Sequence, residues 1–67
     1  MREQLIAYFE QQMGYMDRVR TAHAKVIFHD KCFGAIDFAV NAGLIEKDEG
    51  VAIWEEWHDK LMNRAYT

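Results

Sequence analysis

The feature that most constrains the fold of this chain is an apolar stripe that runs through residues 2–42 without a strong stop. Apolar side chains recur in it at intervals of three, four and seven residues, which is the pattern of one face of an α-helix. Proline is absent from the whole chain, so nothing in this segment forces the backbone out of a helix. The stripe therefore predicts one long helix over about 2–42, with Gly14 as the place where it would kink or break.

A turn signal ends this segment. The tripeptide Asn-Ala-Gly at 41–43 supplies a glycine for the left-handed position that follows many helices, and Leu44 and its neighbour can fold back on the last turn. Asp48 is then predicted to be the N-cap of a second helix that covers about 48–65. The chain of 67 residues is thus expected to be a single all-α domain, a helical hairpin with a loop near 43–47.

The two predicted helices differ in length too much to bury each other. A helix of about 40 residues is about 60 Å long and one of about 18 residues is about 27 Å long, so the second shelters only half of the first. The uncovered apolar side chains are expected to form an interface with another copy, in a dimer of hairpins that makes a helical bundle. These residues are Leu5, Ile6, Phe9, Met13, Met16 and Val19.

The same sequence also allows a second arrangement. A break near 14–17, with Asp17 as a new N-cap, would let the N-terminal arm fold back and complete a three-helix bundle within one chain. In the favoured hairpin, the core between the two helices is predicted from the apolar faces of both. Its members are Val26, Phe33, Ile36, Val40, Trp54, Trp57 and Leu61.

The small size of the chain also favours association. A domain this short has a core that rarely supplies more than about 3–5 kcal/mol, and small domains add disulfides, metals or oligomerisation. Cys32 is the only cysteine, so an intramolecular disulfide is excluded. No uncharged run approaches the roughly 18 residues of a membrane-spanning helix, and the N-terminus lacks the apolar segment of a signal peptide. We therefore expect a cytoplasmic protein without membrane contact.

The charge balance argues against a general nucleic-acid binder. The formal net charge is −3, and residues 34–67 hold seven acidic and three basic side chains. Affinity for phosphate grows with the number of Lys and Arg contacts. One cluster of basic side chains lies in the middle of the first predicted helix, where acidic side chains are interleaved with it. Its members are Arg18, Arg20, Lys25 and Lys31. Nucleic acid is therefore not an expected partner. The expected partners are a second copy of the chain and, in addition, another protein.

Few residues have the spacing of reactive or metal-binding groups. Glu55 and His58 are three residues apart on the second predicted helix, and His29 and Cys32 have the same spacing on the first, which places each pair on one helix face. Neither pair is accompanied by enough further ligands to complete a site, so these four residues are weak metal candidates. No catalytic residue, resident metal or other cofactor is expected, and the chain is not expected to be an enzyme.

The function predicted from these observations is that of a small homo-oligomeric helical protein that acts as a protein–protein interaction or regulatory module. The alternative is a nucleic-acid-associated regulatory protein, which would use the basic cluster. A metal-binding helical bundle ranks last, because the weak candidates form only pairs.

Overall fold

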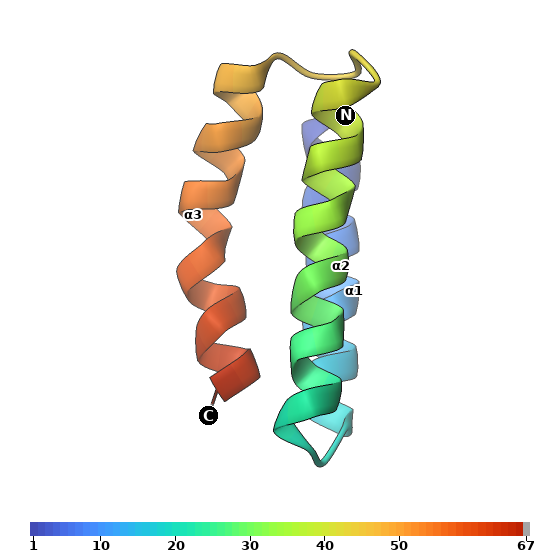
Figure 1. Ribbon diagram of the computed structural model, residues 1–67, viewed down its shortest axis with the longest axis vertical. Coiled ribbons are helices and arrows are strands. Elements are labelled where there is room, and N and C mark those ends of the chain that lie inside the picture. Colours follow the sequence, from blue (N-terminus) through green and yellow to red (C-terminus); the bar gives the residue numbers. More distant parts are fainter. Residues whose placement is uncertain (67) are drawn as a thin grey trace.

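The computed structural model describes residues 1–66, and three helices account for most of them: α1 (Arg2–Arg18), α2 (Ala22–Asn41) and α3 (Lys47–Tyr66). The helices lie side by side along the long axis of a molecule that measures 35 × 17 × 16 Å (Figure 1). α2 runs antiparallel to both of the other helices (Figure 1). Residues 1–66 contain no strand, and the predicted all-α class is confirmed.

The prediction of one helix over 2–42 is wrong, because α1 ends at Arg18. The next residue, Val19, has extended backbone angles, φ −89° and ψ 155°, although its N–H still donates to the carbonyl oxygen of Tyr15 at 3.2 Å. Extended angles turn the following peptide away from the helix axis. The apolar stripe is therefore divided between two helices of 17 and 20 residues that fold back on each other.

Thr21 sets the place at which α2 begins. Its hydroxyl oxygen accepts a hydrogen bond from the N–H of Ala24 at 3.1 Å, which satisfies one of the donors that the start of a helix leaves unpaired. Gly14, the predicted kink, lies inside α1, and Asp17, the predicted N-cap, lies in its last turn. The alternative three-helix arrangement is the one that the structure contains, with its turn a few residues later than the sequence indicates.

The turn after α2 has the geometry that its glycine predicts. Gly43 has a φ of +75°, in the left-handed region that glycine adopts without strain. The N–H groups of Gly43 and Leu44 donate to carbonyl oxygens of the last turn of α2 at 3.1 and 2.9 Å, as in a Schellman motif. Ile45, rather than Leu44, packs back on the core. α3 begins at Lys47, so Asp48 lies in its first turn and is not the N-cap.

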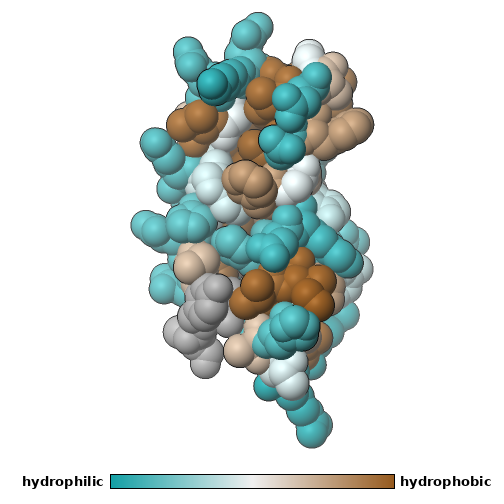
Figure 2. Space-filling model, in the orientation of Figure 1, coloured by the Kyte–Doolittle hydropathy of each residue, from teal (hydrophilic) through white to brown (hydrophobic). Residues whose placement is uncertain are grey.

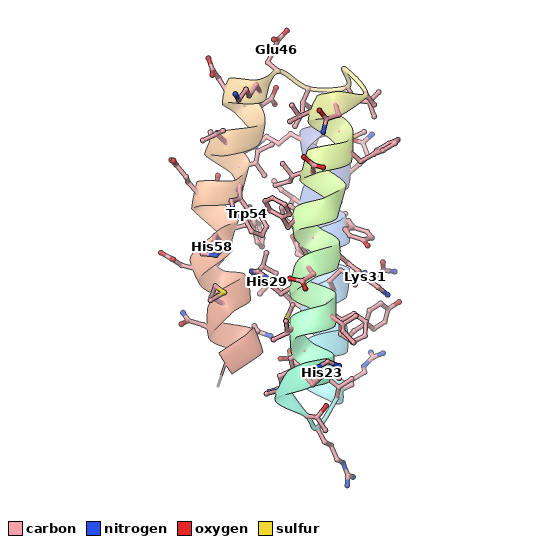
Figure 3. The ribbon with its side chains drawn as sticks, viewed as in Figure 1. His23, His29, Lys31, Glu46, Trp54 and His58 are labelled. Atoms are coloured by element: carbon pink, nitrogen blue, oxygen red, sulfur yellow. The ribbon has the colours of Figure 1, made fainter. Side chains whose placement is uncertain are left out.

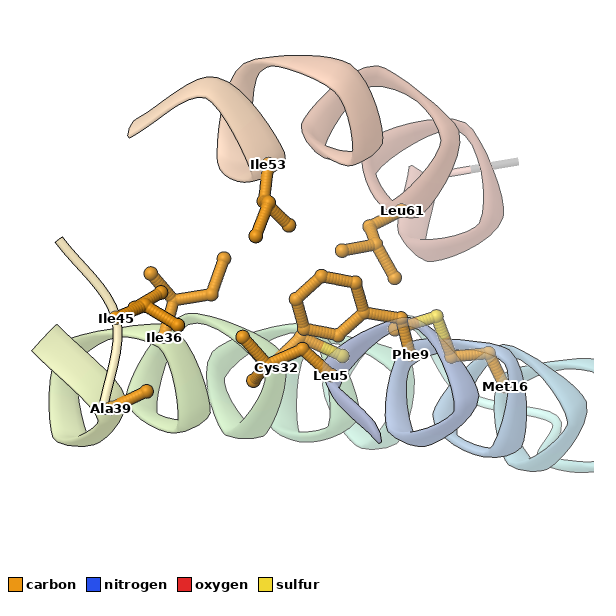
Figure 4. Close-up of a cluster of buried hydrophobic side chains, with 9 residues drawn as sticks. All are labelled: Leu5, Phe9, Met16, Cys32, Ile36, Ala39, Ile45, Ile53 and Leu61. Atoms are coloured by element: carbon orange, nitrogen blue, oxygen red, sulfur yellow. The ribbon is translucent and has the colours of Figure 1, made fainter. Parts of the chain in front are cut away.

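The hydrophobic core lies where the three helices meet and draws side chains from each of them (Figure 4). Three of the side chains predicted to face another chain are buried in it. The other three of that set, Ile6, Met13 and Val19, are half-buried. The buried members are Leu5, Phe9 and Met16 of α1, Cys32, Ile36 and Ala39 of α2, Ile45 of the loop, and Ile53 and Leu61 of α3.

This core changes the expected interface. Because the chain turns after Arg18, α2 and α3 already cover the apolar side of α1. The reason for expecting an intermolecular contact through residues 5–19 is thereby removed. Of the predicted core between the other two helices, Ile36 and Leu61 are buried and four members are half-buried, whereas Phe33 is exposed. Those four are Val26, Val40, Trp54 and Trp57.

Two ion pairs join α1 to α3 at the surface. A guanidinium nitrogen of Arg2 lies 2.7 Å from a carboxylate oxygen of Glu56, and Arg64 donates to the carboxylate of Asp17. All four side chains are about half open to solvent, so each pair contributes at most about 1 kcal/mol. They align the parallel helices α1 and α3, while burial of the core supplies most of the stability.

Candidate functional site

A groove with a volume of about 390 Å³ runs along the seam between α2 and α3. Apolar side chains reach the surface between these two helices in the upper half of the molecule (Figure 2). The residues that line the groove are Phe33, Ile36, Asp37 and Val40 of α2, and Lys47, Gly50, Val51, Trp54 and Glu55 of α3.

Gly50 allows the two helices to approach closely at the floor of the groove. A Cβ atom at this position would lie 2.6 Å from Cγ2 of Val40, well inside the distance at which two carbon atoms attract each other. The role of Gly50 was not predicted, because a glycine in the first turns of a helix carries no signal until the side chain across from it is known. Gly14, in contrast, has open space around its missing Cβ.

This difference between the glycines leads to a testable prediction. Gly14→Ala should raise the free energy of unfolding by about 0.5–1 kcal/mol, because alanine loses less backbone entropy in a helix and meets no neighbour there. Gly50→Ala should lower it, because crowding against Val40 outweighs the gain in helix propensity. Urea unfolding followed by circular dichroism measures both changes. Equal stabilisation by the two substitutions would contradict the close approach at Gly50.

Trp54 forms the wall of the groove together with Phe33. The two ring centroids are 5.3 Å apart and the planes meet at 70°, close to the edge-to-face geometry that aromatic pairs prefer. On its other side, Trp54 lies 5.6 Å from the ring of His29 and 5.1 Å from that of His58. The rings of His29, Trp54 and His58 form a cluster between α2 and α3 (Figure 3), in which each ring lies within 5.7 Å of the other two. Trp54 thus packs against one ring of the groove wall and against the two imidazole rings.

Two apolar side chains of the groove remain half open to solvent. Phe33 is 53% exposed and Val51 is 47% exposed. The prediction that Phe33 belongs to the core is wrong because Cys32 and Ile36, one position before and three after it, point between the three helices instead. Neighbouring apolar side chains that stay exposed in a groove make it a candidate binding site.

The rim of the groove carries charges of both signs. Lys47 and Glu55 stand on α3 with Val51 midway between them, and Asp37 stands on the α2 side. All three charged side chains are exposed. A partner that places opposite charges at the two ends of the groove is therefore favoured over one of uniform charge.

The four weak metal candidates do not converge on one point. His29 and His58 meet across α2 and α3, with ring centroids 5.7 Å apart, while Cys32 is buried in the core and Glu55 stands on the groove rim. Nδ1 of His29 lies 3.3 Å from a carboxylate oxygen of the neighbouring Asp30. Across the described part of the chain, no group of three or more His, Cys, Asp or Glu side chains is placed to hold a metal ion.

One buried polar side chain interrupts the apolar face of α1. Gln12 is buried, and its Oε1 atom has no hydrogen-bond partner. Nε2 of His29 and Nε1 of Trp57 are also buried without a hydrogen-bond partner, so each of the three helices carries one buried, unpaired polar atom among those described. A buried polar atom without a partner costs about 1–3 kcal/mol. The polar interruption of the stripe at Gln12 therefore weakens the bundle.

Replacing Gln12 should increase stability. Gln12→Met keeps the length of the side chain and removes the buried carbonyl group, so we expect the free energy of unfolding to rise by about 1–3 kcal/mol. Gln11→Met is the matched control, because Gln11 is exposed on the same helix and its replacement should change stability by less than about 0.5 kcal/mol. Chemical unfolding measures both variants. A loss of stability in Gln12→Met would mean that the amide is satisfied in solution.

The basic side chains do not form one surface. Arg18 and Arg20 are exposed at the turn between α1 and α2, whereas Lys25 is half-buried. The Lys31 ammonium lies 5.1 Å from the centre of the Phe28 ring, on the side of α2 that faces away from α3 (Figure 3). A cation in this position is attracted to the aromatic face.

Comparison with other proteins assigns no relative. No protein-family model matches the chain, and neither a curated protein nor a solved structure shows significant similarity to it. None of the helices in residues 1–66 has the length and apolar character needed to cross a bilayer. The function is therefore argued from the groove and its charges.

Proposed function

We propose that the protein is a small self-associating interaction module, in which the groove between α2 and α3 binds a second copy of the chain. The observation that carries this proposal is the half exposure of Phe33 and Val51 in an apolar groove. Fully burying a side chain of this size is worth about 1.5–3 kcal/mol. Because Phe33 and Val51 are already about half buried in the single chain, association through the groove would gain about half of this free energy for each of them.

Two features favour a second copy as the occupant. The rim carries Lys47 and Glu55, so an identical chain presents an opposite charge for each of them. A chain of 67 residues also has a small core, and small domains often gain stability by oligomerisation. The proposed module acts in the cytoplasm, where a lone thiol such as that of Cys32 stays reduced.

The size of the contact is set by what a stable dimer needs. Specific protein–protein interfaces bury about 800 Å² on each partner, and the chain exposes 4533 Å². The contact must therefore cover roughly a sixth of the surface. The floor of the groove is too small for this alone, so both rims, with Lys47, Asp37 and Glu55, belong to the proposed contact.

The molecular mass in solution tests the proposal. Light scattering over a range of concentrations should give twice the chain mass of 7.9 kDa. Val51→Asp should give the mass of one chain with an unchanged helical circular dichroism spectrum, because this side chain is half exposed and a buried carboxylate in the contact is costly. A single-chain mass for the unmodified protein at the highest concentration would remove the proposal.

A matched variant shows whether the effect belongs to the groove. Ile27 is 45% exposed, nearly the same as Val51, but it does not line the groove. Ile27→Asp should therefore keep the doubled mass. Dissociation by both substitutions would contradict a contact through the groove.

A further inference from the structure

We infer that two copies meet with their α3 helices antiparallel, about a two-fold axis that passes close to Val51. This inference rests on the proposed self-association through the groove. It adds the orientation of the two chains and the residues that select it.

The inference begins with the exposed ridge of α3. Lys47, Val51 and Glu55 are spaced by four residues, and all three line the groove, so they form one ridge along the helix. Eight residues of helix span about 12 Å. The ridge therefore has a positive charge at one end, an apolar side chain in the middle and a negative charge at the other end.

Two-fold symmetry leaves two ways to pair this ridge with its copy. In a two-fold dimer every contact occurs twice. If residue i of one chain contacts residue j of its partner, residue j of the first chain also contacts residue i of the partner. Antiparallel helices place Lys47 against the partner's Glu55 and repeat that contact on the other side of the axis. Parallel helices place lysine against lysine and glutamate against glutamate, and such like-charge contacts disfavour a pairing. The charges thus select the antiparallel arrangement.

The apolar residues fit the same arrangement. Val51 lies midway between the two charges, so the antiparallel pairing brings the two valines together at the axis. Trp54, one turn further along α3, and Phe33 across the seam form the wall next to this ridge, and the ridge of the partner covers them. The exposed apolar surface of the groove is then buried at the centre, with the charged pairs at its margins, as in most specific interfaces.

Charge reversal tests the orientation directly. Lys47→Glu alone, or Glu55→Lys alone, places like charges together at both contacts and should raise the dimer dissociation constant by about 10- to 100-fold. The double variant Lys47→Glu/Glu55→Lys restores opposite charges at both contacts and should return the dissociation constant to within about threefold of the original. Analytical ultracentrifugation measures the constant, and circular dichroism confirms that each variant is folded.

The single variants also provide a complementary mixture. An equimolar mixture of the Lys47→Glu and Glu55→Lys chains has opposite charges at both contacts of a mixed antiparallel dimer, so it should associate more tightly than either variant alone. Glu49→Lys is the control for the change in net charge, because Glu49 is exposed on α3 but does not line the groove. It should leave the dissociation constant unchanged.

The outcomes separate the two proposals. If each single reversal leaves the dissociation constant unchanged while Val51→Asp abolishes the dimer, self-association stands and the antiparallel orientation is wrong. If the double variant stays as weak as the single ones, Lys47 does not face the partner's Glu55. If the unmodified chain is monomeric, the proposed function and this inference fail together.

Discussion

Replacing Phe9 with alanine should destabilise the folded chain by about 3–5 kcal/mol. The ring is fully buried and packs 5.9 Å, between centroids, from the ring of Trp57. Its removal forfeits the free energy of burial and leaves a cavity at the place where the three helices meet. Since a core of this size supplies only about 3–5 kcal/mol, the variant should be largely unfolded, as measured by the loss of helical circular dichroism.

Phe38→Ala is the matched control for this experiment. Phe38 is 68% exposed on α2, so the same change of side chain creates no cavity and should alter stability by less than about 0.5 kcal/mol. The comparison also distinguishes the three-helix chain from the hairpin predicted from sequence. If Phe9→Ala remained folded but became monomeric, Phe9 would belong to an interface between chains instead of the core of one.

The thiol of Cys32 should be nearly inert in the folded chain. The side chain is fully buried, and burial raises the pKa of this thiol from 9.0 to about 12. Because the thiolate is the reactive form, three pKa units reduce its amount by about 1000-fold below pH 9. Alkylation by iodoacetamide should therefore be slower by at least about that factor in the folded chain than in urea, with mass spectrometry as the measurement.

Moving the cysteine to an exposed position tests whether burial is the cause of the slow alkylation. In the variant Cys32→Ala/Asp30→Cys, the only thiol stands at a position whose native side chain is largely exposed, so it should react about as fast in the folded chain as in urea. Fast alkylation of Cys32 itself, without unfolding, would show that the interior between α1 and α2 opens readily.

The raised pKa of Cys32 also predicts how stability changes with pH. The unfolded chain releases the thiol proton near pH 9, whereas the folded chain holds it until about pH 12. Between these values the folded state binds more protons, so the contribution of this thiol to stability is complete below pH 9 and declines as the pH rises toward 12. Comparing alkaline unfolding of the native chain with that of Cys32→Ala checks this sign.

Several local features of the fold were predictable because they depend on neighbours in sequence. Helical periodicity without proline indicated an all-α chain, and Gly43 indicated the turn after α2, where its φ of +75° is found. The turn after α1 carried a weaker signal. Thr21 is a good N-cap residue, but no glycine or proline stands beside it to mark a stop.

The candidate site was less predictable, because each of its features depends on two helices. Trp54 and Phe33 were both expected in the core, but Trp54 is half-buried on the groove wall and Phe33 is half exposed beside it. The role of Gly50 depends on Val40, which approaches it from α2. Periodicity shows which residues share a helix face, but not which neighbouring helix covers that face.

The amino-acid sequence by itself determined that this chain is helical, where its second turn lies and which side chains share each apolar face. Only the tertiary structure decided that the chain turns at Val19 and Thr21, since one extended residue and one capping hydrogen bond outweigh a continuous apolar pattern. That turn folds α1 onto the other two helices and buries Phe9 and Met16 within one chain. It leaves the groove between α2 and α3 open to solvent, with Phe33 and Val51 half exposed in it, and the proposed contact depends on this groove.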